Sequence, residues 1–521
     1  MMLPNHRICL QYGLLLSSAF AALATSVDDT PGPRLGAVAS ENSVCSRIGT
    51  RLLEDGGNAV DALVGTVFCV GTVAMYHSGI GGGGFLLLRK PNGSYESVDF
   101  RESAPAAAFE DMFKHDVNAS LFGGLARYMD SVSPNEFLTE DPTWAVDFAP
   151  RGRRVRLGET MTRKRYANTL EAIAEEGADA FYTGAIARAT IAALKSANGT
   201  MTVEDLGNYT LAHQRPVDIQ YRGHKLTSTN APSSGIVALS ALNTLSGYDD
   251  FQEPSYSKSS THLMLEAIKW AYGQRTQLGD PAFSPSMRTY TESMISAETG
   301  AEIRSKISSK TTFDLSYYDP MGLESIETPG TSHIVTADVS GLTVSMTTTV
   351  NTLFGSQLMV PETGVIMNNE MNDFSIPGES KLFGYVPNAA NFVRPGKRPL
   401  SAISPIIAET PDGKLFFSIG SAGSSRITTA NIQTAIHLID GNMTTAEALS
   451  QPRLHDQLVP RRVTFEYTYD NGTVAYLKSL HHNVTWVAPG ESTAQGLRRL
   501  LNGTFEAAGE PRQRNSGGFA V

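Results

Sequence analysis

One short junction in the chain combines residues that can generate a nucleophile. Thr331 follows a Pro329-Gly330 turn and stands at the start of a strand-like stretch. A threonine in such a place is ordinarily a β-branched residue that fills a strand. If the Gly330–Thr331 bond were cut, the new α-amine would have a pKa of about 7.7–8.0 and would be able to act as base for its own hydroxyl. The junction is therefore a candidate N-terminal nucleophile.

Several ordered sequence blocks surround this junction and extend over nearly the whole chain, from about residue 36 to the Gly517-Gly518 tail. In the C-terminal part the blocks are residues 331–338, 347–356, 362–375, 396–405 and 420–427. In the N-terminal part they are residues 57–62, 79–85, 99–105, 232–235 and 278–281. In these blocks and in their order the chain resembles the γ-glutamyltransferase family. No Walker sequence, His-Glu-x-x-His motif or Gly-x-Ser-x-Gly elbow suggests another chemistry.

The resemblance implies an α+β fold, a four-layer αββα sandwich of the N-terminal-nucleophile hydrolase type, made as one precursor. It implies cleavage between Gly330 and Thr331 into a large subunit, residues 25–330, and a small catalytic subunit, residues 331–521, that remain together as a heterodimer. Thr331 would then attack the γ-amide of glutathione or a related γ-glutamyl compound and form a γ-glutamyl ester. Water, an amino acid or a dipeptide would accept the acyl group. No metal or organic cofactor is implied.

The resemblance also assigns binding roles by position. Thr349 would orient the Thr331 amine. The substrate α-carboxylate would be bound by donors, and the α-ammonium by acceptors, because a planar guanidinium matches a carboxylate and an ammonium needs oxygen partners. The donors are Arg101 and Ser401, and the acceptors are Asn351, Glu370 and Asp373.

Two departures from the family pattern fall inside this implied site. The backbone N–H groups of Gly423 and Ser424 would form the oxyanion hole, where the family usually has two glycines. Ala402 replaces the second serine of a usual pair, which removes one donor to the carboxylate. His333 and His455 are predicted to be structural, because the mechanism needs no imidazole base.

Two alternative functions remain open at this point. One is a glutaryl-type, cephalosporin-like acylase of the same superfamily. Glu370 and Asp373 oppose it, because a glutaryl substrate has no ammonium group for two carboxylates to bind. The other is a non-catalytic homologue that keeps the fold as a binding protein, for which Ala402 and Ser424 are the only support.

The apolar periodicity predicts the elements that position these motifs. Steps of three and four residues between residues 36 and 71, broken by a turn at 55–58, predict two helices. The glycine run 79–84 precedes a strand at 85–88, so it is not a dinucleotide fingerprint. Further helices are expected over 167–194 (two) and 261–275. Strands are expected at 334–336, 342–347, 364–367, 406–407, 415–419 and 463–467.

The N-terminus is typical of an exported protein. Arg7 precedes an apolar run over residues 8–24 that ends in Ala22-Leu23-Ala24, which predicts a signal peptide over residues 1–24. An uncleaved membrane anchor is the alternative, although the run is short and broken for a membrane span. Eight glycosylation acceptors support secretion. They are Asn92, Asn118, Asn198, Asn208, Asn442, Asn471, Asn483 and Asn502.

The cysteine content fits an oxidising compartment. Cys9 lies in the predicted signal peptide, which leaves Cys45 and Cys69. A disulfide between these two is expected, with two buried free thiols as the alternative, and no set of four cysteines remains for structural zinc.

Composition and charge exclude several classes of protein. With 41% hydrophobic and 18% charged residues, the chain is neither disordered, nor a coiled coil, nor fibrous. Its net charge of −10 disfavours nucleic acid as a partner. The local basic cluster at residues 151–165 is interpreted as a solvated face.

Overall fold

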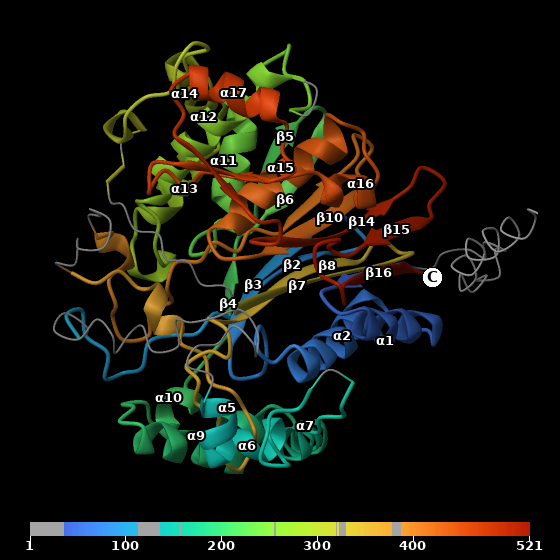
Figure 1. The fold of residues 1–521 in the computed structure, drawn as a ribbon, viewed down its shortest axis with the longest axis vertical. Helices are drawn as coiled ribbons and strands as arrows, with labels where there is room; N and C mark the ends of the chain where they lie inside the picture. Colours follow the sequence, from blue (N-terminus) through green and yellow to red (C-terminus); the bar gives the residue numbers. More distant parts are fainter. Residues whose placement is uncertain are drawn as a thin grey trace, which may run out of the picture.

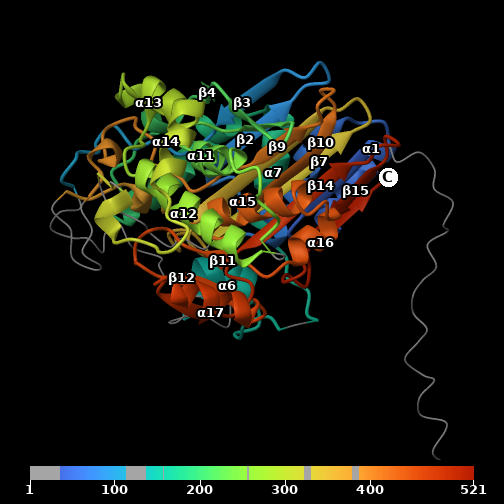
Figure 2. The same ribbon diagram turned by 90° about the horizontal axis from the view of Figure 1, so that it is seen from above.

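The computed structural model describes residues 36–112, 136–156, 158–254, 257–318, 320–321, 330–377 and 387–521 of the chain. Two β-sheets lie face to face, with helices on both outer sides (Figure 1 and Figure 2). This is the four-layer αββα arrangement that the resemblance implied. The predicted signal peptide, residues 1–24, and Asn118 lie outside the described residues.

The first sheet holds the candidate nucleophile on an inner strand, β7, which Thr331 enters as its second residue. Every residue of β7 is buried, as a strand covered on both faces requires. Neighbouring strands of this seven-stranded sheet are antiparallel. Their order is β16 (Gly517–Ala520), β1 (Gly36–Ser40), β7 (Gly330–Asp338), β8 (Thr343–Asn351), β2 (Gly83–Arg89), β3 (Tyr95–Asp99) and β4 (Ala212–Gln214).

The second sheet packs its inner face on β7 and β8, mainly through β10 and β14. Apolar side chains from both sheets, among them Leu87, Val335, Ile407 and Leu497, form the core between them. Its order is β15 (Phe505–Ala508), β14 (Thr493–Arg499), β10 (Leu415–Ala422), β9 (Ile406–Glu409), β6 (His224–Ser228) and β5 (Val217–Tyr221). A small third sheet contains β11 (Leu454–His455), β12 (Val463–Glu466) and β13 (Val484–Val487).

Helices cover the outer faces of both sheets. On the first sheet lie α1 (Ser43–Glu54) and α2 (Ala59–Val73), and Asn58 starts α2 with a capping box. On the second lie α11 (Gly235–Ser246) and α15 (Arg426–Ile439), with α12 (Lys258–Arg275) packed on α11. The remaining helices of this side are α13 (Met287–Met294), α14 (Ala297–Lys306), α16 (Thr445–Ser450) and α17 (Asn471–Ser479).

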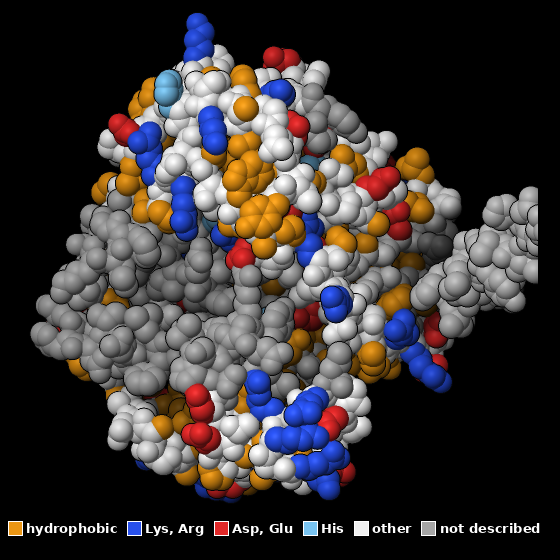
Figure 3. Space-filling model, in the orientation of Figure 1, with side chains coloured by type: hydrophobic (Ala, Val, Ile, Leu, Met, Phe, Trp, Pro, Cys, Tyr) orange, Lys and Arg blue, Asp and Glu red, His pale blue; other side chains and the backbone are white. Residues whose placement is uncertain are grey.

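A lobe of short helices lies below the sheets in Figure 1. It comprises α5 (Phe137–Glu140), α6 (Pro142–Phe148), α7 (Lys164–Glu176), α8 (Asp179–Tyr182), α9 (Ala185–Ser196) and α10 (Val203–Gly207). Figure 3 shows Lys and Arg side chains gathered on this part of the surface. Arg151 and Arg153 of the basic cluster are exposed and pair with Glu159.

Most predicted elements are confirmed with shifted ends. The two early helices, the strand after the glycine run and the helix at 261–275 are all present. Residues 167–194 contain three helices instead of two, because Gly177, at φ +80°, ends α7 early. The strand predicted at 364–367 is wrong. Gly364, at φ +66°, turns the chain there, and only an isolated bridge joins Ile366 to Met359.

The disulfide between Cys45 and Cys69 is confirmed, and it joins α1 to α2 across 24 residues. Closing a loop of this length stabilises the folded state by about 3–3.5 kcal/mol in the chain-entropy model. A Cys45→Ala/Cys69→Ala variant is therefore expected to melt several degrees below the natural protein. Mass analysis after alkylation in denaturant without reductant gives an independent check, because two modified thiols would contradict the bond.

Two features bear on the export prediction. Among the residues that the structure describes, none of the helices has the length and apolar character needed to cross a membrane. All seven described acceptor asparagines are exposed, as glycosylation requires; they are Asn92, Asn198, Asn208, Asn442, Asn471, Asn483 and Asn502.

Candidate functional site

The candidate nucleophile lies where the pairing of β7 with β8 changes register. Thr331 pairs with Thr349, whereas Gly330 pairs with Asn351, so the register shifts at the Gly330–Thr331 bond. Such irregularities occur next to active sites, where they re-aim a side chain. The Thr331 hydroxyl donates a hydrogen bond of 3.2 Å to the Thr349 hydroxyl.

Thr349 connects the nucleophile to the bond that precedes it. Its hydroxyl donates to the Gly330 carbonyl oxygen at 2.6 Å and accepts the backbone N–H of Asn351 at 2.7 Å. The donated bond polarises the carbonyl that Thr331 would attack. Gly330 has no room for a side chain, because a Cβ there would lie 2.2 Å from the carbonyl oxygen of Thr352.

The residues expected to bind the α-carboxylate and the α-ammonium of the substrate contact one another directly. Arg101 follows β3 and is almost wholly buried, and its guanidinium forms ion pairs with Glu370 and Asp373. The Asp99 carboxylate accepts the Arg101 backbone N–H at 3.0 Å. The Tyr209 hydroxyl donates to the Arg101 carbonyl at 3.1 Å. The backbone of Arg101 is thus held as firmly as its side chain.

Arg101 and the carboxylates of Glu102, Glu370 and Asp373 form a charged cluster, since Glu102 also interacts electrostatically with the guanidinium. Burial raises the pKa of Glu102 to about 7 and raises the pKa of Glu370 above its ordinary value, against the opposing effect of Arg101. Burial acts to lower the pKa of Arg101, but Glu370 and Asp373 outweigh it, so the guanidinium stays charged. The cluster thus combines one guanidinium with carboxyl groups whose protonated form is favoured by burial.

Asn351 joins the nucleophile to the charged cluster. Its side-chain amide donates to the Asn369 carbonyl at 3.0 Å, and Asn369 precedes Glu370. Asn351 has φ +77°, a strained conformation that is common at functional sites. Its buried Oδ1, like Oε2 of Glu370, has no hydrogen-bond partner among the described residues. Both oxygens are free to accept from a substrate ammonium.

Ser401 is buried, and its hydroxyl oxygen accepts one local hydrogen bond, which leaves its O–H free to donate. Among the described residues, Ser401 accepts the backbone N–H of Ile403 at 3.2 Å and makes no hydrogen bond to Arg101. Ala402 packs in a small apolar cluster with Phe85, Ile403 and Ile427.

Gly423 and Ser424 form the turn between β10 and the N-terminus of α15. Backbone N–H groups at a helix N-terminus favour negative charge. Three residues earlier, Gly420 lies against the His333 ring of β7, where a Cβ would be 2.1 Å from Cε1. This close approach sets β10 against the strand of the nucleophile.

Ser424 has φ +59°, in the left-handed region, where a residue other than glycine costs about 1–2 kcal/mol. We expect Ser424→Gly to raise the melting temperature and to change kcat by less than about tenfold, because the donor is a backbone group. His481→Gly, at φ +71° on the surface, is the matched control. A rise in kcat of about a hundredfold for Ser424→Gly alone would show that serine impairs the oxyanion hole.

His333 and His455 are fully buried and stay neutral. Burial lowers the pKa of each to about 3. His333 hydrogen-bonds to Thr347 at 2.9 Å, and His455 to Thr429 at 2.9 Å.

A cavity of about 400 Å³ adjoins the charged cluster. Glu102 and Glu370 lie on one wall, and Phe100, Phe181 and Tyr209 contribute to its apolar lining. Both carboxylate oxygens of Glu102 are buried and have no hydrogen-bond partner among the described residues.

Among the described residues, one group has the residue types that bind metal ions. Ligand atoms of His262, Glu266 and His482 lie within 4.8 Å of one another. A cation already occupies the surroundings, because the Lys269 ammonium lies 3.2 Å from Glu266 and 3.3 Å from His482. The group is a buried hydrogen-bonded network.

Two residues of the site had no role in the sequence interpretation. Glu102 brings a third carboxylate to Arg101, and Asn369 carries the connection from Asn351 to Glu370. Both lie inside the matching blocks, directly beside assigned residues. Their position next to residues with assigned roles was the only feature of the sequence that pointed to them.

The chain matches the sequence model of the family described as Gamma-glutamyltranspeptidase over residues 45–129 and 123–520. It is 48% identical to the "Glutathione hydrolase proenzyme" of Arthroderma benhamiae, covering 94% of this chain and 93% of the relative. It is also 48% identical to the "Glutathione hydrolase" of Aspergillus flavus, covering 94% and 90%.

The fold is similar to that of a solved acylase. The crystal structure of cephalosporin acylase from Bacillus halodurans superposes with a TM-score of 0.77, over 96% of this chain and 99% of that chain. The two sequences are 23% identical. This likeness concerns the architecture.

Proposed function

Because this chain belongs to the γ-glutamyltranspeptidase family, we propose that the residues around Thr331 carry out a two-step γ-glutamyl transfer. The protein is an enzyme of the γ-glutamyltransferase/glutathione hydrolase class. Its substrates are glutathione and other γ-glutamyl compounds.

Maturation comes first in the proposed sequence. The Thr331 hydroxyl attacks the Gly330 carbonyl carbon, and its proton passes to the Thr331 nitrogen as the peptide C–N bond breaks. Thr349, which donates to the Gly330 oxygen at 2.6 Å, stabilises the negative charge that develops there. Water then hydrolyses the ester. It leaves a large subunit that ends at Gly330 and a small subunit that begins with a free Thr331 amine, residues 25–330 and 331–521.

Turnover uses the same hydroxyl with its own amine as base. The donor's γ-carbonyl is placed at Thr331, and the backbone N–H groups of Gly423 and Ser424 receive the oxyanion. Cysteinylglycine leaves glutathione with a proton from the amine, and a γ-glutamyl ester remains on Thr331. Water, or the amine of an amino acid or dipeptide acceptor, then attacks the ester and restores the hydroxyl.

The α-end of the donor is bound by the charged cluster. Arg101 exchanges part of its contact with Glu370 and Asp373 for the α-carboxylate, with Ser401 as a further donor. The ammonium is taken up by Asn351, Glu370 and Asp373. The orphan acceptor oxygens of Asn351 and Glu370 support this assignment.

The predicted signal peptide and the exposed acceptor asparagines support secretion of the processed heterodimer. Retention at a membrane by an uncleaved N-terminal segment is the alternative. Detection of the N-terminus of the secreted large subunit by mass spectrometry distinguishes the two.

One geometric observation supports the proposal most directly, namely the hydrogen-bonded row of Thr331, Thr349 and the Gly330 carbonyl. The test is product analysis of the purified protein on glutathione. We expect glutamate and cysteinylglycine in buffer, and in addition a tripeptide, the γ-glutamylated acceptor, when a dipeptide acceptor is present. Absence of cysteinylglycine release from a processed protein would overturn the assignment.

A further inference from the structure

Gly423 has another segment directly against its backbone. A Cβ on Gly423 would lie 2.5 Å from the carbonyl oxygen of Glu491 and 2.8 Å from the Cα of Ser492. Ser492 itself is buried and immediately precedes β14, which pairs with β10 up to Ala422. The direction of the Gly423 N–H group therefore depends on where Ser492 lies.

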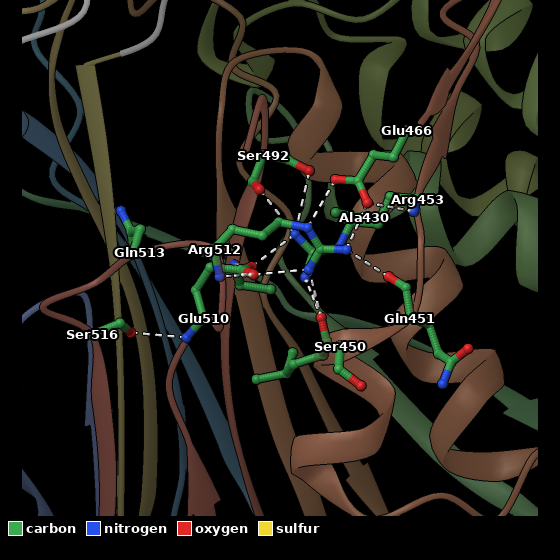
Figure 4. A network of polar contacts seen from close by, with 12 residues as sticks. Ala430, Ser450, Gln451, Arg453, Glu466, Ser492, Glu510, Arg512, Gln513 and Ser516 are labelled. Carbon is green, nitrogen blue, oxygen red and sulfur yellow. Dashed lines mark hydrogen bonds and ion pairs between the residues drawn. The ribbon is translucent and has the colours of Figure 1, made fainter. Parts of the chain in front are cut away.

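Two buried side chains of opposite charge hold the start of β14. Arg453 donates to the Ser492 carbonyl at 2.9 Å, and Glu510 accepts the Ala494 backbone N–H at 2.7 Å (Figure 4). Arg453 and Glu510 form an ion pair with each other at 2.8 Å. The carbonyl of Ser492 and the N–H of Ala494, two residues further on, are thus attached to one ion pair.

A second pair holds the first in place. Arg512 binds Glu466 through two hydrogen bonds of 2.8 and 2.7 Å and reaches Glu510 at 2.8 Å. Glu466 in turn accepts the Arg453 backbone N–H at 3.0 Å. The two arginines and two glutamates balance in charge, and their side chains are at most 10% exposed. Burial acts to raise the pKa of Glu510, but Arg453 and Arg512 outweigh it and hold that pKa below its usual value.

The ion-paired network fixes the start of β14. A buried, charge-assisted network has one low-energy arrangement, because each charge would be costly without its partner. Ser492 is fixed by it, and Gly423 has no space to move toward Ser492. The network therefore acts on the turn that offers its N–H groups to the oxyanion.

We propose that Arg453 and Glu510 are positioning residues for the oxyanion hole and act on Gly423 through Ser492. This inference rests on the proposed function, in which Gly423 is a donor to the oxyanion. The pair touches neither the substrate nor Thr331. Its effect is expected on the transition state and not on substrate binding.

The test uses Arg453→Lys and Glu510→Gln, which keep the size and polarity of the side chains. Turnover is measured per titrated Thr331 nucleophile, so that incomplete maturation does not enter the rate. We expect kcat to fall by about 10- to 100-fold with KM within about threefold. Affinity for a γ-boronate analogue of glutamate, whose adduct with Thr331 is tetrahedral and anionic, is expected to fall in parallel with kcat/KM.

Arg89→Lys and Glu409→Gln are matched controls. Arg89 and Glu409 form an equally buried ion pair at 2.7 Å, and Arg89 also donates to two loop carbonyls, of Gly341 and Gly413. These variants should lower the melting temperature while kcat stays within about twofold.

Two results would overturn the inference. One is a kcat within about threefold of the natural value in the mature Arg453→Lys and Glu510→Gln variants. The other is failure of both variants to give any mature protein, which would assign the pair to folding. Neither resembles failure of the proposed function itself, because in that case the natural protein would release no cysteinylglycine from glutathione.

Discussion

Replacement of Thr331 by alanine is expected to leave one full-length chain without γ-glutamyl activity. The substitution removes both the oxygen that attacks the Gly330 carbonyl and the cleavage that creates the catalytic amine. Loss of a covalent nucleophile commonly lowers kcat by well over about a thousandfold. A denaturing gel and a glutathione assay measure the two consequences in the same preparation.

Ser332→Ala is the matched control for this prediction. Ser332 is the next residue of β7, and its buried hydroxyl has no hydrogen-bond partner among the described residues. The control should mature and turn over normally, and Thr331→Ser should mature more slowly but still give two subunits. Two subunits of normal size from Thr331→Ala would remove Thr331 from the mechanism.

The sequence predicted the architecture well where the signals were local. The two early helices, the β2 strand after the glycine run, and the β7–β8 pair around a turn at residues 338–341 all follow from apolar spacing and turn residues. The strand predicted at 364–367 failed for a conformational reason. Valine and isoleucine favour strands, but the left-handed Gly364 before them ends a turn at residues 361–363.

The site was predictable by resemblance and not by residue pattern. Arg101 and Glu370 are 269 positions apart, so no local spacing brings them together. Their direct contact was also not foreseen, because Arg101 was expected to bind the substrate α-carboxylate and Glu370 the α-ammonium. It arises because both are buried beside one another, where each charge needs a partner.

The sequence left the conformation of Ser424 open, although the family usually has glycine at this position. Serine does not favour the left-handed conformation, and here the turn from β10 into α15 imposes it. The network of Arg453, Glu466, Glu510 and Arg512 joins segments that follow different helices and strands. Only the packing of β14 beside Gly423 gives those residues a connection to the site.

Asp373→Ala is expected to lower kcat/KM for γ-glutamyl substrates by about 30-fold to several thousandfold, which corresponds to about 2–5 kcal/mol for a lost partner of a desolvated charge. Maturation should be nearly unaffected, because self-cleavage involves no bound amino acid.

Arg101→Gln should lower kcat/KM by a similar factor. It should also reduce stability, since it leaves the buried carboxylate of Glu370, and those of Glu102 and Asp373 beside it, without the charge of Arg101.

Asp147→Ala is a control that removes an ion-paired carboxylate far from Arg101 in the sequence and outside the proposed site. Asp147 is buried and pairs with Arg165 at 2.9 Å in the lobe of short helices. This variant should lose stability but keep kcat/KM within about threefold.

A substrate without the α-amine makes the test specific for the ammonium. The natural enzyme should discriminate strongly against a glutaryl amide relative to the γ-glutamyl amide, because a glutaryl group brings no ammonium for the carboxylates to bind. Asp373→Ala should lose most of that discrimination, since the variant gives up the interaction that only the γ-glutamyl substrate makes. If Asp373→Ala keeps kcat/KM for the γ-glutamyl substrate within about threefold, the ammonium is bound elsewhere. The carboxylates would then serve only to hold Arg101, and the glutaryl acylase alternative would gain support.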